Sequence, residues 1–154
     1  MRHQIDLCDG FHVLGVELDQ PPLRLDHSDA WCGEFSDHCD EIRAASLEED
    51  YYGVYCKLEG YQRGDLIVGM RVDPELVAPD GLKVLRVPSG PEAVFRCDQS
   101  ILAMGWSAVL AKWLDEYGYQ RDESRPVYER FVGPAAGRTP RVEIHVPIVD
   151  AGDR

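Results

Sequence analysis

Basic residues are scarce in this sequence. The chain has 16 Lys plus Arg against 28 Asp plus Glu, which gives a formal net charge of −12, and no basic run occurs. A nucleic-acid binder needs Lys and Arg to neutralise phosphates and to release their counterions. We therefore expect no direct binding to DNA or RNA. An anionic membrane surface would repel the chain for the same reason.

Long apolar runs and paired cysteines are also missing. No apolar run approaches the roughly 18 residues of a membrane-spanning helix, and the N-terminal stretch carries Asp6 and Asp9 where a signal peptide would be apolar. The five cysteines are scattered, odd in number and without a C-x-x-C pair. That usage favours reduced thiols over a disulfide framework or a zinc site. We expect a cytoplasmic protein with no metal site and no cofactor.

The signature motifs of common enzymes do not occur either. No Walker loop, G-x-G-x-x-G or H-E-x-x-H motif is found, and no Ser-His-Asp arrangement is recognisable. Glu129 and Glu143 could be interpreted as an acid–base pair, but nothing in the sequence brings them together. We therefore disfavour an enzyme and predict no catalytic residue.

The composition that remains is that of an ordinary folded domain. The 154 residues are 44% hydrophobic and 29% charged, which is typical of one globular core. No linker divides the chain. We expect a single domain over residues 1–150, with residues 151–154 as a frayed tail.

Strand and helix patterns follow one another in a repeated order. Strands are predicted at 11–18, 51–58, 66–72, 82–87 with a continuation at 93–97, 127–132 and 142–148. One helix is predicted to begin at Ser28 or Asp29, and a stronger one to run from Asp98 or Ser100 to Tyr117, where Gly118 suits a helix end. The order strand, helix, strand, strand occurs twice, about 70 residues apart. This pattern predicts an α+β fold of two βαββ units, with an eight-stranded antiparallel sheet and a cleft between its halves.

One predicted strand carries a carboxylate where hydrophobic residues are expected. In residues 127–132, alternation places Val127, Glu129 and Phe131 on one face of the strand. A carboxylate among apolar neighbours can bind a cation with little competition from water. The alternative is that Glu129 lies on a solvated face and pairs with an arginine, since most Glu residues are exposed.

Several segments in order resemble the GyrI-like small-molecule-binding domain, which is also the effector-binding domain of many AraC-type and MerR-type multidrug regulators. The matching segments are residues 51–55, 67–73, 87–95, 113–119, 126–131 and 142–148. Their order and spacing carry the resemblance, and the first 50 residues match more loosely. The resemblance implies two βαββ units related by pseudo-two-fold symmetry, with an aromatic-lined cleft around one buried Glu.

The resemblance also implies which residues line that cleft. Glu129 corresponds to the buried Glu of the family, and Phe131 to a residue of the wall. His145 stands where many relatives have an aromatic residue, and it either stacks as a neutral ring or pairs with Glu129 when charged. Further predicted wall residues are Trp106, Tyr52, Tyr55, Trp31 and Phe35. The alternative for the helical aromatics is an ordinary place in the hydrophobic core.

Three functions follow from the resemblance. The first is a stand-alone module that binds small cationic or aromatic, drug-like molecules. The second is a small-molecule hydrolase that uses the same Glu as general acid or base. The third is an interaction protein similar to a gyrase inhibitor. Regulators of this family carry an added DNA-binding domain, whereas the predicted fold uses the whole chain, so we expect the binding module. A protein partner or a homodimer is left open.

Overall fold

The fold is described from a computed structural model, which describes residues 3–17, 34–56, 66–97, 106–132 and 141–149. Within those residues the chain forms helices and strands in the following order: β1 (His3–Cys8), β2 (Phe11–Glu17), α2 (Glu34–Ala45), β3 (Ser46–Tyr55), β4 (Leu66–Val72), β5 (Lys83–Val87), β6 (Gly90–Cys97), α4 (Trp106–Tyr117), β7 (Val127–Val132) and β8 (Arg141–Pro147). The predicted α+β class is confirmed.

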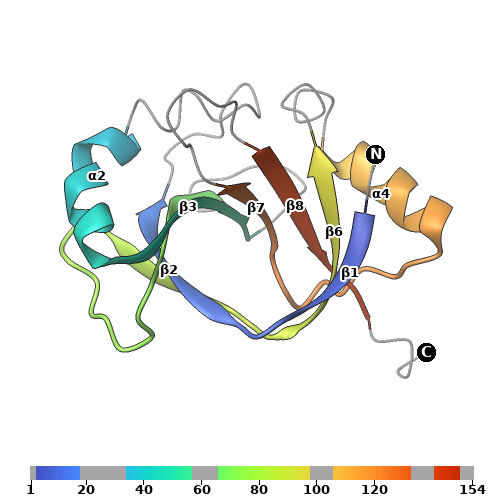
Figure 1. The fold of residues 1–154 in the computed structure, drawn as a ribbon, viewed down its shortest axis with the longest axis horizontal. Helices are drawn as coiled ribbons and strands as arrows, with labels where there is room; N and C mark the ends of the chain where they lie inside the picture. The colour runs from blue at the N-terminus through green and yellow to red at the C-terminus, as the bar shows by residue number, and fades with distance from the viewer. Residues whose placement is uncertain (1–2, 18–33, 57–65, 98–105, 133–140, 150–154) are drawn as a thin grey trace.

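All of these strands belong to one antiparallel sheet. Their order is β1-β6-β8-β7-β3-β4-β2-β5. Helices α2 and α4 lie at opposite ends of the molecule, and the sheet curves between them (Figure 1). The central strands β3, β7 and β8 therefore lie between the two helices.

The sheet is two-fold symmetric in its order and in its register. Exchanging β1 with β5, β2 with β6, β3 with β7 and β4 with β8 gives the same order read from the other edge. Gly53 of β3 pairs with Val68 as Glu129 of β7 pairs with Ile144, and Gly53 and Glu129 pair with each other. The symmetry axis thus passes between Gly53 and Glu129. The repeated element order predicted two similar halves, and the family resemblance implied the two-fold symmetry that the strand order has.

Two parts of the strand pattern differ from the prediction. Strand β1 was not predicted, because it lies at the sheet edge and is mostly exposed, so it has no alternating pattern. Residues 82–97 do not form one interrupted strand. Strand β5 pairs with β2, whereas β6 pairs with β1 and β8. The chain crosses from one half of the sheet to the other between β5 and β6.

The sheet has two buried faces. Helices α2 and α4 pack on the first, which we call the helical face. There Ile42 of α2 is fully buried, and the rings of Trp113 and Phe95 stack with centroids 4.8 Å apart. The non-helical face holds a smaller cluster, in which the rings of Phe11 and Tyr128 lie 5.3 Å apart. Their strands, β2 and β7, are not neighbours, so this contact reflects the curvature of the sheet.

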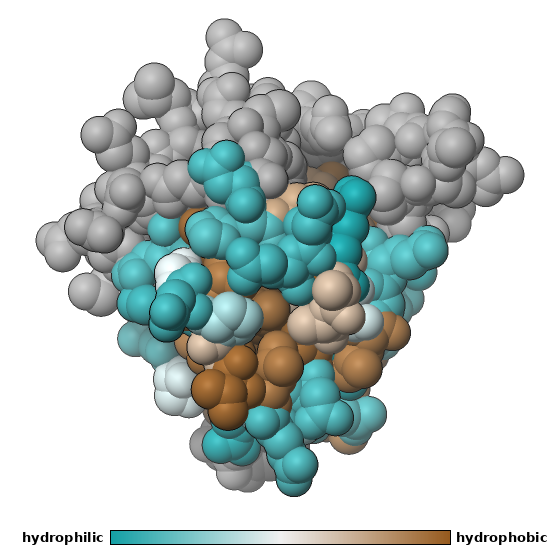
Figure 2. Space-filling view, turned by 90° about the vertical axis from the view of Figure 1, so that its left-hand side faces the viewer, coloured by the Kyte–Doolittle hydropathy of each residue, from teal (hydrophilic) through white to brown (hydrophobic). Residues whose placement is uncertain are grey.

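The surface on the α2 side is mixed in character. Figure 2 shows that side, where apolar residues gather in the lower part and hydrophilic residues surround them. Within the part of the chain that the structure describes, no helix has the length and apolarity needed to cross a bilayer.

Candidate functional site

Glu129 is a fully buried carboxylate at the centre of the sheet. It lies on β7 between Val127 and Phe131, which are 0% and 5% exposed, and its own exposure is 0%. Its cross-strand neighbours are Gly53 on β3 and Ile144 on β8. Antiparallel pairing places all of these residues on the helical face. The alternative of a solvated Glu129 is therefore wrong.

Tyr55 holds the Glu129 carboxylate from the neighbouring strand. The Tyr55 hydroxyl donates a hydrogen bond of 3.1 Å to Oε1 of Glu129, and both side chains are completely buried. A phenol is a neutral donor, so it orients the carboxylate without cancelling its charge. Gly53, directly opposite Glu129, contributes no side chain to this face. The result is one oriented carboxylate among apolar neighbours, between α2 and α4.

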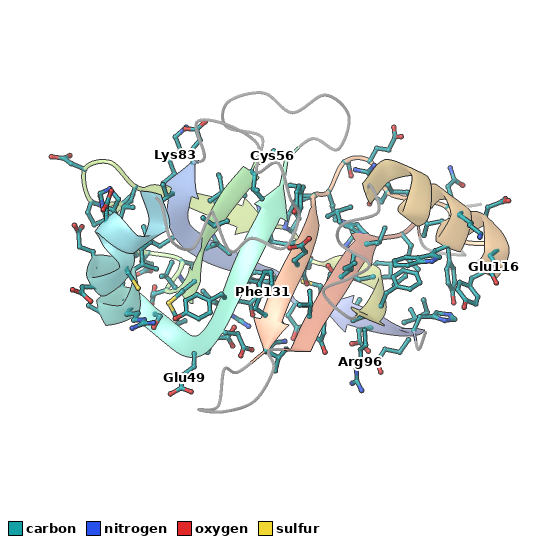
Figure 3. The ribbon with its side chains drawn as sticks, turned by 90° about the horizontal axis from the view of Figure 1, so that it is seen from above. Glu49, Cys56, Lys83, Arg96, Glu116 and Phe131 are labelled. Atoms are coloured by element: carbon teal, nitrogen blue, oxygen red, sulfur yellow. The ribbon has the colours of Figure 1, made fainter. Side chains whose placement is uncertain are left out.

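The structure brings only some of the predicted wall residues to Glu129. Phe131 is two residues along the same strand, and Figure 3 shows it on the central strands between the helices. Tyr55 contacts Glu129, whereas Tyr52 pairs with Arg130 and lies on the non-helical face. Trp31 lies outside the described residues, as do the side chains of Phe35 and Trp106. Both Tyr52 and Tyr55 were predicted wall residues, and the register places only Tyr55 on the face of Glu129.

His145 does not approach Glu129. It pairs across the sheet with Tyr128, and Glu129 pairs with Ile144, so the two side chains lie on opposite faces. The prediction that a charged His145 could pair with Glu129 is therefore wrong. The His145 ring instead stacks on that of Tyr128, with centroids 4.5 Å apart.

A buried polar network surrounds His145 on the non-helical face. Nδ1 of His145 lies 3.2 Å from Oε1 of Glu92, and Nε2 lies 3.3 Å from Oε1 of Glu143. The Tyr128 hydroxyl donates to the same Glu92 oxygen at 2.7 Å. Glu92, Glu143 and His145 are all less than 9% exposed. We call these four residues the His145 network.

The charges of the network change its proton affinities. Burial alone would lower the pKa of His145, but the hydrogen bonds and charges of Glu143 and Glu92 outweigh burial and raise it. Burial, followed by the charge of Glu92, raises the pKa of the Tyr128 phenol. Tyr128 therefore remains a hydrogen-bond donor. The network can hold a charged imidazolium between two carboxylates, and it joins β6, β7 and β8.

Sequence reasoning missed Glu92 and Tyr128 as members of this network. Glu92 lies in β6, where it shares a face of the strand with Val94, and this spacing was its only local signal. Its partners come from strands more than 30 residues away in the sequence. The register that aligns β6 with β8 has no local signature, so the network becomes visible only in the folded chain.

The architecture of this chain also occurs in known structures. No family model matches the chain, and no curated protein matches it in sequence. Several solved structures match it over nearly their whole length, among them three at 12% identity. SAV2435 bound to tetraphenylphosphonium has a TM-score of 0.69 at 12% identity and covers 100% of this chain and 98% of its own. The chain shares its fold.

The other two similar structures agree. The EcmrR C-terminal domain has a TM-score of 0.65 at 12% identity, with 97% of this chain and 98% of that chain covered. A protein from Staphylococcus aureus MU50 has a TM-score of 0.61, also at 12% identity, with 97% and 99% covered. The fold expected from the GyrI-like resemblance is therefore confirmed.

Proposed function

We propose that this chain binds small hydrophobic or aromatic cations, with Glu129 as the polar anchor of the site. The observation that carries the proposal is the complete burial of Glu129 on the helical face, beside apolar residues and the Tyr55 hydroxyl. A carboxylate in surroundings of low dielectric attracts a nearby cation more strongly than one in water does. Phe131 would add an aromatic contact to the bound cation.

The shared fold supports the same class of ligand. Tetraphenylphosphonium, which SAV2435 binds, is a cation whose charge is surrounded by four phenyl rings. Such a cation is weakly hydrated and loses little on leaving water, and its rings suit a site of aliphatic and aromatic side chains. A single buried carboxylate can then select for positive charge, while the apolar neighbours accept many shapes.

The test compares tetraphenylphosphonium with neutral triphenylphosphine oxide in the parent protein and in Glu129→Gln. The substitution keeps the shape of the side chain and removes its charge. We expect the cation to bind more weakly by roughly 1–3 kcal/mol, about 5- to 150-fold in Kd. The neutral ligand should lose little. Isothermal titration calorimetry measures both affinities.

Two control variants test whether a loss of cation affinity is specific to Glu129 or follows from the removal of any negative charge. Glu92→Gln removes a buried carboxylate on the non-helical face. Glu116→Gln removes an exposed charge at the far end of α4 (Figure 3). Both should leave cation affinity within about twofold. Glu92 lies on the opposite face of the sheet beside the His145 ring, and the exposed Glu116 charge is screened by salt. Equal affinity of the parent and Glu129→Gln for tetraphenylphosphonium would contradict the anchor role.

A further inference from the structure

Strand β1 forms one open edge of the sheet, in the half that holds α4 (Figure 1). Within the described residues it pairs only with β6, so its outer row of N–H and C=O groups can accept a further strand. The opposite edge strand, β5, carries the exposed Lys83 and Arg86, and such charged side chains discourage pairing at an edge. Strand β1 has no Lys or Arg. The two edges of the sheet are therefore protected to different degrees.

Exposed apolar side chains gather at the β1 edge. Ile5, Leu7 and Tyr117 are three of the five large hydrophobic residues that are exposed in the described part of the chain. Alternation along β1 places Ile5 and Leu7 on the same face as His3. The His3 ring lies 3.9 Å from that of Tyr117, at the end of α4, and also stacks on Phe95 of the helical face. We call Ile5, Leu7 and Tyr117 the β1 patch.

We propose that two copies of this chain associate through antiparallel pairing of β1 with the same strand of a second copy. A two-fold axis perpendicular to the sheet continues it and keeps both helical faces on one side. Residues that lie directly opposite each other then belong to the same face. With Ile5 opposite Ile5 of the second copy, Leu7 lies opposite His3, and Asp6 lies opposite Gln4.

This register is complementary on both faces of the strand. On the helical face, Leu7 of one copy comes next to His3 of the other, beside the Tyr117 ring, so the β1 patch of each copy covers that of the other. On the other face, Gln4 can donate to Asp6 of the second copy, as its Nε2 donates to Asp6 of its own chain at 2.8 Å. Centring the pair on Asp6 instead would place two carboxylates opposite each other, where like charges repel.

The association is expected to be weak and to strengthen with salt. Pairing of two six-residue strands buries less than the roughly 1,200 Å² of total surface found in stable complexes. Each copy also carries a net charge of −12, and salt screens the repulsion between the two copies. An interface that depended on ion pairs between the copies would instead weaken with salt.

The first test measures the mass of the full chain by analytical ultracentrifugation at concentrations up to about 1 mM. We expect the mass to rise with concentration toward that of a dimer, and to rise further at about 0.5 M than at about 0.05 M NaCl. NMR spectra over the same concentrations locate the contact. The backbone amides of residues 4–8 should shift, and those of β5 should not.

The second test uses two matched variants. Leu7→Gln removes an apolar side chain that is 74% exposed, so the variant should fold normally, and its dimer should dissociate at least about tenfold more readily. Val77→Gln makes the same kind of change at a position that is 85% exposed and lies between β4 and β5. It should change the dissociation constant by less than about twofold.

Three results would each overturn the proposal. The first is a parent that stays monomeric at the highest concentration and salt, which would exclude a second copy as the occupant of the edge. The second is a set of concentration-dependent amide shifts on β5 in place of β1. The third is an equal effect of Leu7→Gln and Val77→Gln on the dissociation constant.

Discussion

At the scale of single residues, Glu92 and Glu129 are buried on opposite faces of the sheet and have different surroundings. Glu92 accepts from the Tyr128 hydroxyl and lies beside the His145 ring, which can carry a positive charge. Glu129 accepts from the Tyr55 hydroxyl, a neutral donor. Glu92 thus belongs to a network that links three strands, which gives it a structural role. Glu129 is the residue that we propose as the anchor for a bound cation.

The raised pKa of His145 predicts a pH-dependent stability. A histidine whose pKa is higher in the folded state stabilises the fold fully below its unfolded pKa, near 6.5, and loses that contribution as pH rises through the folded value. The parent should therefore exceed His145→Gln in free energy of unfolding by more at about pH 5.5 than at about pH 9. Urea unfolding at both pH values measures this difference.

Glu92 and Glu143 are the charged groups facing the ring, and Arg96 lies 3.7 Å from Glu143 on its outer side. Arg96→Gln is therefore the matched control, because it should leave the pH dependence in place. A difference between parent and His145→Gln that stays constant with pH would show that folding does not change the pKa of His145, and would contradict the raised value.

At the scale of elements, the crossing from β5 to β6 depends on Gly90. Its φ is 148°, and a Cβ there would lie 2.2 Å from Nη1 of Arg125. Arg125 is buried, and its Nη2 donates to the carbonyls of Pro91 and Ile148 at 2.7 and 3.0 Å. The guanidinium cannot move away without breaking these bonds. Because Gly90 has no Cβ, the backbone of the turn can pack directly against the Arg125 guanidinium.

Gly90→Ala should destabilise the protein by roughly 2–4 kcal/mol, since backbone strain adds to the loss of buried hydrogen bonds. Gly118→Ala is the matched control. Gly118 ends α4 at φ 73°, and a Cβ at this position would meet no atom within 4 Å, so only strain applies. That variant should lose about 1 kcal/mol. Guanidinium unfolding measures both, and equal losses would contradict the role given to Arg125.

The elements also show which features could be predicted from sequence. Strand β7 alternates regularly, so the face of Glu129 followed from Val127 and Phe131 alone. Strand β1 could not be found, because Ile5 and Leu7 are 46% and 74% exposed and its partner β6 is distant in the chain. The separation of β5 from β6 and the partners of His145 depend on long-range register, which local patterns do not encode.

At the scale of the whole molecule, the net charge of −12 determines which molecules the electrostatic field attracts and which it repels. The field favours cations and opposes polyanions over roughly one Debye length. The isolated chain should therefore give no shift of duplex DNA in a gel at physiological salt. A micromolar, salt-sensitive shift would contradict this prediction.

The symmetry axis passes between Gly53 and Glu129, so the two halves of the chain contribute different residues to the same position. In a homodimer of identical half-length chains, both residues beside the axis would be the same. Two glutamates would then face each other at a cross-strand Cα distance of about 4.5–5.5 Å, and like charges in that position repel. In this chain one of the two positions is Gly53 and the other is Glu129. A single buried charge at the centre of a two-fold scaffold is possible only because both halves are covalently one molecule, so that each half can differ from its counterpart.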